Sequence, residues 1–352
     1  MSHFPYIVAL CTILFSCTKP HNAEISVYKG FELEEELRSN VVNLDTVFCR
    51  YPFRVTVKDS VVIVFDLHNA DFFFHAFSYP EWKYLVSFGK RGQAPKEMLS
   101  AETFQFNSLD SIWTLDANKM ELRRWSMNPQ ECTVLQEETI LLDKELVRPL
   151  DFYAMDSGFL IPDYLGASRY HCVNEEGVLV ASEEAIPTEK KYEGLSRPAL
   201  AQAWRSFINY SAKHQILVMA TQLGEVLEIS NLKENERTIL KGPNGEPKFQ
   251  ISGGEAIPTG IMGFSDVQIT DNYIYAVFHG TTFKDIMSSY QKGVKPKDGG
   301  RYIYVFDLKG KPVKKYILDR YIYGIDVNEE TGTIIATDVN SDNPIVEFKI
   351  NM

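Results

Sequence analysis

The stretch whose residue types come closest to chemistry is a basic loop with two glycines, SFGKRGQAPKEMLS, from Ser87 to Ser100. A phosphate-binding loop of the GxxxxGKS/T type joins a strand to a helix and directs backbone amides at the anion. This stretch has Gly89 and Gly92 but lacks the final Lys-Ser/Thr pair, and both of its flanks are strand-like runs. We therefore interpret it as a connection between two structural units and not as a phosphate site.

Residues that could ligate a metal or attack a substrate are dispersed along the chain. The 7 histidines show no HxH or HExxH spacing, and such spacing is what places two zinc ligands on one element. The segment DVNSDN begins like a calcium loop at Asp338, but Asn343 and Lys349 replace the glycine and the glutamate that such a loop needs. No GxSxG motif marks a nucleophilic serine, although a triad assembled from distant segments stays open. We expect no metal, no cofactor and no catalytic residue.

The composition excludes one class of partner and argues against a cysteine framework. The formal net charge is -11, so binding to DNA or RNA would gain nothing from counterion release, and we expect no nucleic-acid partner. Of the 5 cysteines, Cys49, Cys132 and Cys172 lie beyond the N-terminal region, widely spaced and without a CxxC motif. We expect them to be small buried apolar side chains rather than disulfide partners or zinc ligands.

Any site in this chain has to be carried by β-strands. From Val41 onward, short runs rich in Val, Ile, Phe, Tyr and Thr recur, and they are broken by Asp, Asn, Gly and Pro. Groups of three or four such runs repeat roughly every 45 to 55 residues, the period of a β-propeller built from four-stranded blades. We predict an all-β fold, a six-bladed β-propeller, with blades near 53–88, 102–142, 150–186, 204–241, 264–318 and 321–350.

The ring of blades has a predicted point of closure. The last repeat, 321–350, has three strand-like runs, whereas Asn40–Phe48 is a spare run ahead of the first repeat. Pairing the two would cover two exposed sheet edges, so we predict closure by this N-terminal strand. Within the repeats, near-continuous apolar runs indicate strands buried on both faces. The Asp that ends runs such as VVIVFD, SIWTLD and TIIATD is expected to bind nearby backbone amides in the following turn.

Two segments interrupt the strand pattern, and they direct the choice of candidate site residues. Residues 187–206 contain helix formers after Pro198, and residues 281–300 have the pattern of a short helix followed by a basic, glycine-rich loop. Excursions of this kind rim one face of a propeller, where ligands usually bind. The candidate ligand-binding residues at the mouth of the central channel lie at strand ends or in these excursions: Arg91, Asp163, Tyr164, Arg197, His279 and Tyr323.

The N-terminus indicates export. Residues Tyr6–Phe15 form an apolar run that would span about 15 Å as a helix, half of a bilayer core, so we interpret residues 1–16 as a signal peptide. The sequence LFSC, which ends at Cys17, resembles the lipobox of bacterial lipoprotein precursors. In that family the peptidase cuts before the cysteine and the thiol carries the lipid, which makes Cys17 the expected lipidation site. An ordinary secretory signal with an incidental cysteine is the alternative.

The rest of the chain divides into two parts. Residues 17–39, which begin with the polar TKPHNAE after the cysteine, are expected to form a flexible tether, and residues 40–352 the propeller. The protein would be attached to the outer membrane of a cell envelope through lipid alone. Periplasmic and exterior placement both stay open.

The loop between the first two predicted blades also carries a family resemblance. It is similar to the linker G-x-x-G-x-G-P-G-E-F of NHL-type propellers, which it matches at Gly89, Gly92, Gln93, Pro95 and Glu97. It departs from that linker at three positions where Gly, Gly and Phe are common, namely Ala94, Lys96 and Met98. Together with the lipobox and YVFDLKGKPVKKYIL near the end, residues 40–350 resemble the TolB-like six-bladed propeller lipoproteins of Bacteroidetes. The resemblance implies the fold and an envelope location, and it implies no particular reaction.

The leading hypothesis is a non-catalytic binding scaffold in the cell envelope, whose partner is a protein, a peptide or a glycan. It follows from the anchor, the rigid repeats and the lack of reactive motifs. The alternatives are a propeller hydrolase that acts on lactones or glycans at the central channel, and a sensor that binds a small molecule there. A hydrolase would gather three or more carboxylates or histidines around the central axis.

Overall fold

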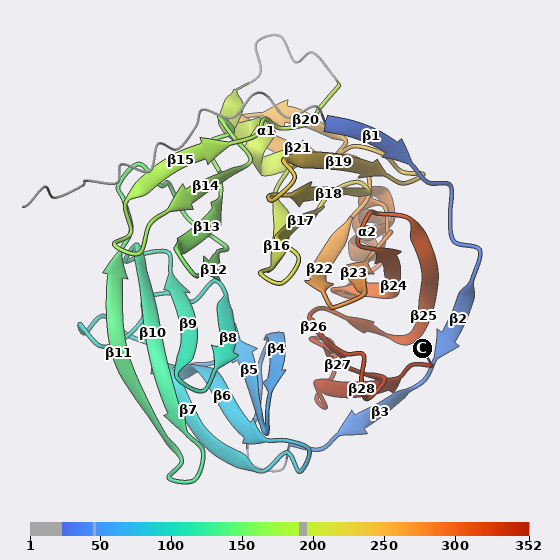
Figure 1. Ribbon diagram of the computed structural model, residues 1–352. Helices are drawn as coiled ribbons and strands as arrows, with labels where there is room; N and C mark the ends of the chain where they lie inside the picture. Colours follow the sequence, from blue (N-terminus) through green and yellow to red (C-terminus); the bar gives the residue numbers. More distant parts are fainter. Residues whose placement is uncertain (1–22, 45–46, 190–195, 352) are drawn as a thin grey trace, which may run out of the picture.

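The computed structural model describes residues 23–44, 47–189 and 196–351. Six sheets of four or five strands stand radially around a central axis, as Figure 1 shows. The predicted six-bladed β-propeller is therefore confirmed. The predicted signal peptide, 1–16, and the expected lipidation site, Cys17, lie outside the described residues. Within the described ranges, no helix has the length and apolarity to cross a membrane.

Each blade is an antiparallel meander whose strands are ordered from the axis outward. Blade 1 consists of β4 (Pro52–Lys58), β5 (Val61–Asp66), β6 (Phe72–Ser78) and β7 (Tyr84–Lys90). Blade 2 consists of β8 (Phe104–Ser108), β9 (Ser111–Asp116), β10 (Glu121–Asn128) and β11 (Thr133–Leu141). Blade 3 consists of β12 (Tyr153–Met155), β13 (Gly158–Pro162), β14 (Tyr170–Val173) and β15 (Leu179–Glu183).

The second half of the ring has the same arrangement. Blade 4 consists of β16 (Ser206–Ser211), β17 (Ile216–Thr221), β18 (Val226–Asn231) and β19 (Glu236–Lys241). Blade 5 consists of β22 (Phe264–Ile269), β23 (Tyr273–Phe278), β24 (Gly300–Asp307) and β25 (Pro312–Ile322). Blade 6 consists of β26 (Ile325–Asn328), β27 (Thr333–Thr337), β28 (Ile345–Lys349) and the N-terminal strand β3 (Ser39–Val42).

The second strand of a blade lies between two neighbouring blades, which explains its continuous apolar sequence. All 6 residues of β5 are buried. Ile63 and Phe65 pack in the cluster shared with blade 2, whereas Val62 and Val64 pack in the cluster shared with blade 6. Alternate side chains of one strand therefore fill two different seams, which accounts for the apolar run that precedes the terminal Asp66.

The N-terminal strand closes the ring, as predicted. β3 pairs antiparallel with β28, and Val41 lies opposite Val346. As the outermost strand of blade 6, β3 also places Val42 in the seam between blades 6 and 1. The strand ends at Val42, earlier than the predicted run Asn40–Phe48.

The expected tether, 17–39, is wrong from Ala23 onward. Residues Ala23–Val27 form β1, which pairs in parallel with β19, and Glu34–Leu37 form β2, which pairs in parallel with β25. β2 is an edge strand, and its side chains Glu34 and Glu35 form ion pairs with lysines of β25. β1, β2 and β3 together form the N-terminal belt around blades 4, 5 and 6 (Figure 1).

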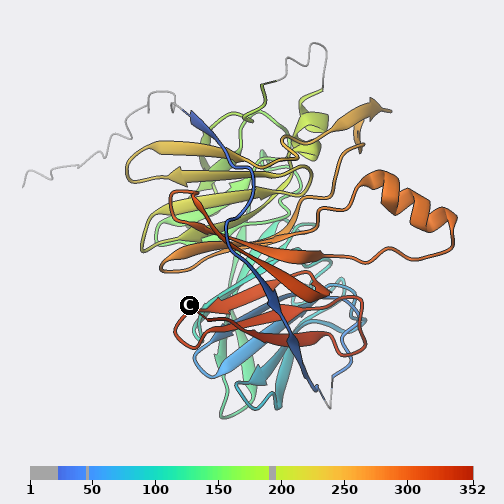
Figure 2. The same cartoon turned by 90° about the vertical axis from the view of Figure 1, so that its right-hand side faces the viewer.

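The excursions lie on one face of the ring, as expected. α1 (Arg197–Ala203) lies in the linker from blade 3 to blade 4, and the hairpin of β20 (Phe249–Ser252) and β21 (Glu255–Pro258) lies in the next linker. α2 (Phe283–Gln291) joins β23 to β24. Because antiparallel strands alternate in direction, linkers and connections of this kind emerge at the same face. Figure 2 shows all three projecting from one side, which we call the insert face.

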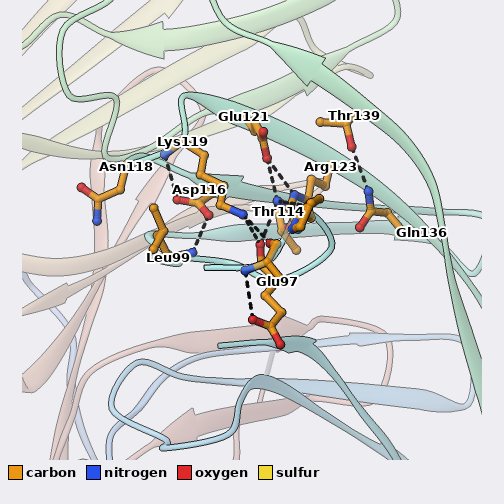
Figure 3. Close-up of polar contacts among 12 residues, drawn as sticks. Glu97, Leu99, Thr114, Asp116, Asn118, Lys119, Glu121, Arg123, Gln136 and Thr139 are labelled. Carbon is orange, nitrogen blue, oxygen red and sulfur yellow. Dashed lines mark hydrogen bonds and ion pairs between the residues drawn. The ribbon is translucent and has the colours of Figure 1, made fainter. Parts of the chain in front are cut away.

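The Asp that ends a second strand binds backbone amides, as predicted, but chiefly those of the linker that enters its blade. Asp66 accepts hydrogen bonds from the amides of Arg50 and Tyr51, both at 2.7 Å. Asp116 accepts one from the amide of Leu99 at 2.7 Å, drawn in Figure 3. These carboxylates hold the entry to the innermost strand at the insert face.

The cysteines agree only in part with the expectation that all are buried. Cys49 is buried in the seam between blades 6 and 1, and Cys172 is half-buried in β14. Cys132 is exposed in the turn between β10 and β11. The expectation is therefore wrong for Cys132, because the third turn of a blade lies at the rim of the ring.

Candidate ligand-binding site at the channel mouth

The basic loop Ser87–Ser100 connects β7 to β8, and its polar groups are used internally. The Glu97 carboxylate folds back, accepting hydrogen bonds from Lys90 Nζ at 2.8 Å and from the amide of Ala94 at 3.1 Å. Arg123 Nη2 donates to the carbonyl of Glu97 at 2.9 Å, and Lys119 Nζ donates to the same carbonyl at 2.6 Å (Figure 3). The loop turns carbonyl oxygens towards two cations of blade 2, which is a structural join and not an anion cradle.

A group of side chains blocks the central channel near the insert face. Phe53 and Arg54 belong to β4 of blade 1, Phe207 belongs to β16 of blade 4, and Tyr323 follows β25. Blades 1 and 4 are opposite each other in the ring, yet the ring centroids of Phe53 and Phe207 are 6.4 Å apart. The Arg54 guanidinium carbon lies 4.6 Å from both of those centroids and 5.9 Å from that of Tyr323. We call these four residues the channel plug.

Beyond the plug, the channel contains a cavity of about 270 Å³ lined by the innermost strand of every blade. The polar side chains of this cavity fasten neighbouring blades to each other at five of the six seams, among the residues that the structure describes. The bonds run from the amide of one blade to the side chain of the preceding one: Ala154 to Gln105 Oε1 at 2.8 Å, Ile208 to Asp151 Oδ2 at 3.3 Å, Ile269 to Asn209 Oδ1 at 3.0 Å, Ile325 to Asp266 Oδ2 at 2.8 Å, and Val57 to Asp326 Oδ2 at 2.9 Å.

Burial perturbs the carboxyl groups of the channel. Desolvation raises the pKa of Asp151 to about 7 and that of Asp326 to about 6, although Arg54 opposes the rise at Asp151 and the Val57 amide opposes it at Asp326. The pKa of Asp266 is also raised by burial, despite Arg54 Nε at 3.4 Å. In the part of the chain that the structure describes, no three His, Cys, Asp or Glu side chains are placed to hold a metal ion.

On the insert-face side of the plug, arginine and tyrosine side chains surround the channel mouth. Tyr51 lies with its ring centroid 6.2 Å from that of Tyr323 and donates a hydrogen bond to Asp298 Oδ2 at 3.4 Å. The Arg205 guanidinium carbon lies 5.9 Å from the ring centroid of Tyr164. Burial raises the pKa of the Tyr164 and Tyr323 phenols, and the charge of Arg205 acts against that rise at both. Arg205 is therefore within electrostatic range of two phenols that come from different blades.

The comparison with protein families matches this architecture. A family model described as TolB-like 6-blade propeller-like covers residues 31–330. This chain belongs to the TolB-like six-bladed propeller family. The resemblance inferred from the linker loop and the repeats is thus confirmed at the level of the family.

Solved structures that share the fold of this TolB-like propeller include two from Bacteroides. One, from Bacteroides fragilis and provisionally described as exported, is 10% identical with a TM-score of 0.53, covering 93% of this chain and 100% of the other. The second, a DUF4221-family member from Bacteroides vulgatus, is 8% identical with a TM-score of 0.52, covering 90% and 96%. Identities this low establish the fold alone. No protein among the curated sequences matches the chain.

Two of the predicted site residues of this TolB-like propeller, Tyr164 and Tyr323, reach the channel mouth. Arg91 instead donates to the carbonyls of Leu67 at 2.9 Å and Asn69 at 3.0 Å, so it holds its own blade together. Asp163 accepts hydrogen bonds from two amides of its own loop, at 2.6 and 2.7 Å. Although burial alone would raise the pKa of Asp163, those bonds and His171 lower it to about 2.

The remaining two predicted residues lie on the insert face but outside the mouth group. Arg197 is exposed at the first turn of α1. His279 is half-buried beside the α2 excursion, with Nε2 3.3 Å from the carbonyl oxygen of Lys297, and burial lowers its pKa. Ligand binding by any of the six residues stays a prediction.

Arg54 and Arg205 were missed, although the sequence contains a signal for them. Each stands beside an aromatic residue at the start of an innermost strand, in YPFRVTV and AWRSFINY. A cation at the start of a strand that should be buried on both sides needs a partner or an opening to water. Such a cation therefore indicates a position at the central channel. Our choice of candidate residues considered strand ends and excursions, and so it left out these strand starts.

Proposed function

We propose that this TolB-like propeller is a lipid-anchored envelope scaffold that binds a protein, peptide or glycan on its insert face. The observation that carries the proposal is that all three excursions, α1, the β20–β21 hairpin and α2, project from one face (Figure 2), which is also the face with the mouth of the blocked channel. A plugged channel has a floor, so the mouth forms a shallow receptor surface rather than a conduit. Rigid repeats that display variable loops on one face suit binding.

The course of the N-terminal belt supports an orientation of this face. β19 runs towards the insert face, because it leads into the linker that carries the β20–β21 hairpin. β1 is parallel to β19, with Ala23 opposite Arg237, so the belt begins at the opposite face. A lipid on Cys17 is separated from Ala23 by a chain that spans on the order of 20 Å when extended. The anchor would thus hold the opposite face near the membrane and leave the insert face accessible.

The provisional description of the Bacteroides fragilis neighbour as exported agrees with this setting. We place the protein at the outer membrane, attached through lipid on Cys17. The signal sequence and the lipobox support the proposed export and lipid anchor. The insert face is the proposed binding surface.

The test is in-cell cross-linking followed by affinity purification and mass spectrometry in the source organism. A variant with residues 283–296 replaced by a short Gly-Ser loop removes α2, which has no buried residue, so the fold should survive. The matched control is Lys233→Glu in the turn between β18 and β19, on the opposite face. The proposal expects cross-linked partners that are lost in the α2 variant and kept in the control. Equal recovery from all three proteins would contradict it.

A hydrolase of lactones or glycans is the second candidate, and one observation favours it. Asp151 lines the channel cavity with a pKa raised by burial to about 7, and a group of that pKa is suited to proton transfer near neutral pH. Its two oxygens already accept hydrogen bonds from the amides of Phe152 and Ile208, which favours the structural role. Turnover of a lactone or glycan panel that is lost in Asp151→Asn would establish the hydrolase.

A further inference from the structure

Arg205 differs from the other inward arginines of the propeller in having no bonded partner. Arg169 and Arg237 both pair with Glu228, and Arg123 pairs with Glu121. Arg205 Nε is shielded from solvent without a hydrogen-bond acceptor. Across the described residues, the Arg205 guanidinium forms neither a hydrogen bond nor an ion pair. The Nη1 and Nη2 groups are likewise unbonded within the described ranges but are not shielded from solvent, so they can meet an acceptor supplied from outside.

Arg148 carries a second guanidinium, whose charge acts on the same carboxyl group as that of Arg205. Arg148 is exposed in the linker from blade 2 to blade 3 and has a left-handed backbone, with φ of 49°. Both cations act on the half-buried carboxyl group of Glu102. Burial raises the pKa of Glu102, and the positive charges of Arg205 and Arg148 oppose that rise. Neither arginine is hydrogen-bonded to Glu102 within the described ranges. Within the described ranges, Arg205 and Arg148 are also not bonded to Asp298, the carboxyl group at the mouth that accepts the Tyr51 hydroxyl.

Two phenol hydroxyls complete the arrangement. Tyr164 and Tyr323 both lie within electrostatic range of Arg205, and neither hydroxyl has a hydrogen-bond partner among the residues that the structure describes. The faces of Phe53, Arg54 and Phe207 close the floor below them. Unused donors of two kinds therefore lie on the insert-face side of the channel plug.

We propose that the channel mouth binds a carboxylate of a polypeptide, held by Arg205 with Arg148, Tyr164 and Tyr323 as further donors. A guanidinium matches a carboxylate with two parallel hydrogen bonds, and Nη1 and Nη2 of Arg205 are the groups that can donate them. A polypeptide is favoured because tyrosine and arginine dominate the energetics of protein interfaces. The insert face also exposes Met287 and Tyr290 of α2, which suit apolar peptide side chains. This inference rests on the proposed binding function and names its ligand class.

The test uses the purified protein and small defined probes at constant ionic strength. Saturation-transfer NMR compares the pentapeptide acetyl-Ala-Ala-Glu-Ala-Ala-amide with its Gln counterpart, and sodium glucuronate and inorganic phosphate serve as non-peptide anions. We expect the Glu peptide to bind about tenfold more tightly than the Gln peptide and both other anions. Arg205→Met should abolish that preference and Arg205→Lys should keep part of it. Arg124→Met should leave it unchanged, because Arg124 is paired with Glu138 on the side of blade 2.

Thermal unfolding provides a second readout. Removal of an unpaired buried N–H group should leave Arg205→Met as stable as the wild type or more stable, whereas loss of the Arg169 pair should lower the melting temperature. Equal binding of the Glu and Gln peptides, unchanged binding in Arg205→Met, or equal binding of glucuronate would overturn the inference. If the cross-linked partners of the insert face survive in Arg205→Met, the inference fails while the binding function stands.

Discussion

The guanidinium carbon of Arg54 lies 4.6 Å from the ring centroid of Phe207, which belongs to the blade on the opposite side of the axis. The same guanidinium pairs with Asp266 through Nε at 3.4 Å, so one cation joins three blades across the centre of the ring. Both charged side chains are largely shielded, with 13% and 9% of their areas exposed. The channel plug therefore stabilises the ring both by packing between opposite blades and by a shielded ion pair.

Arg54→Met should destabilise the propeller by about 3 kcal/mol at pH 8, because it preserves much of the packing but leaves the Asp266 carboxylate buried without its cation. Urea unfolding at pH 8 measures the loss. The double variant Arg54→Met/Asp266→Asn should recover most of it, since no charge is then stranded. A double variant as unstable as the single one would show that packing, and not the ion pair, is what Arg54 contributes.

Stability should fall as the pH rises through the region of the Asp151 pKa. Because the folded-state pKa of Asp151 is raised to about 7, its contribution to folding stability is fully present below its pKa in the unfolded chain, about 4. That contribution is lost as the pH rises through 7. Relative to Asp151→Asn, the wild type should lose on the order of 2 kcal/mol between pH 5 and pH 8. The subtraction is needed because burial lowers the pKa of His75 and His279, which favours folding as the pH rises to their unfolded value. A pH-independent difference would contradict the prediction.

Gly92→Ala should cost about 1 kcal/mol of stability. A Cβ at position 92 would lie 1.9 Å from Glu97 Oε2, so the carboxylate would have to leave Lys90 and the Ala94 amide. The loss should shrink in a Glu97→Ala background, where nothing occupies that space, but part of it should remain because Gly92 has φ of 157°, which alanine rarely adopts. Chemical denaturation of the four proteins in this cycle measures the coupling, and additive losses would refute the close contact as its cause.

Cys17→Ala should abolish incorporation of labelled palmitate and move the protein from the membrane to the soluble fraction, because the thiol is the proposed site of acylation. Cys132→Ala is the matched control, since Cys132 is a free and exposed thiol. Fractionation and radiolabelling in the source organism make the comparison. Persistent labelling of Cys17→Ala would exclude the anchor.

The repeat rhythm predicted the fold and the closing strand because strand patterning is local. The continuous apolar run VVIVFD indicates a strand that is buried on both faces. An incomplete last repeat indicates that its fourth strand comes from elsewhere in the chain. The strands β1 and β2 were not predicted, because edge strands are held by backbone pairing and a few side-chain contacts near them. One such contact is the hydrogen bond from the Tyr28 hydroxyl to Glu225 at 2.6 Å. Their mostly polar side chains have the composition of a solvated segment.

The site was predicted less well, since it depends on which strand starts converge at the axis. Tyr164 and Tyr323 were found because they follow strands at the insert face. Arg54 and Arg205 were missed because their importance arises from partners on distant blades, and no spacing in the sequence reports a contact between blades 1 and 4. The seam-fastening role of Asp151 was hidden for the same reason.

The N-terminal belt has a mechanical consequence. β1, β2 and β3 lie in succession on blades 4, 5 and 6, so a pull on the N-terminus would detach β1 first and β2 second, and only then load β3, whose pairing with β28 completes the ring. The first two strands can peel away while all six blades stay intact. If the protein is held at a membrane by this end, a pull would lengthen the N-terminal segment while the insert face keeps its structure.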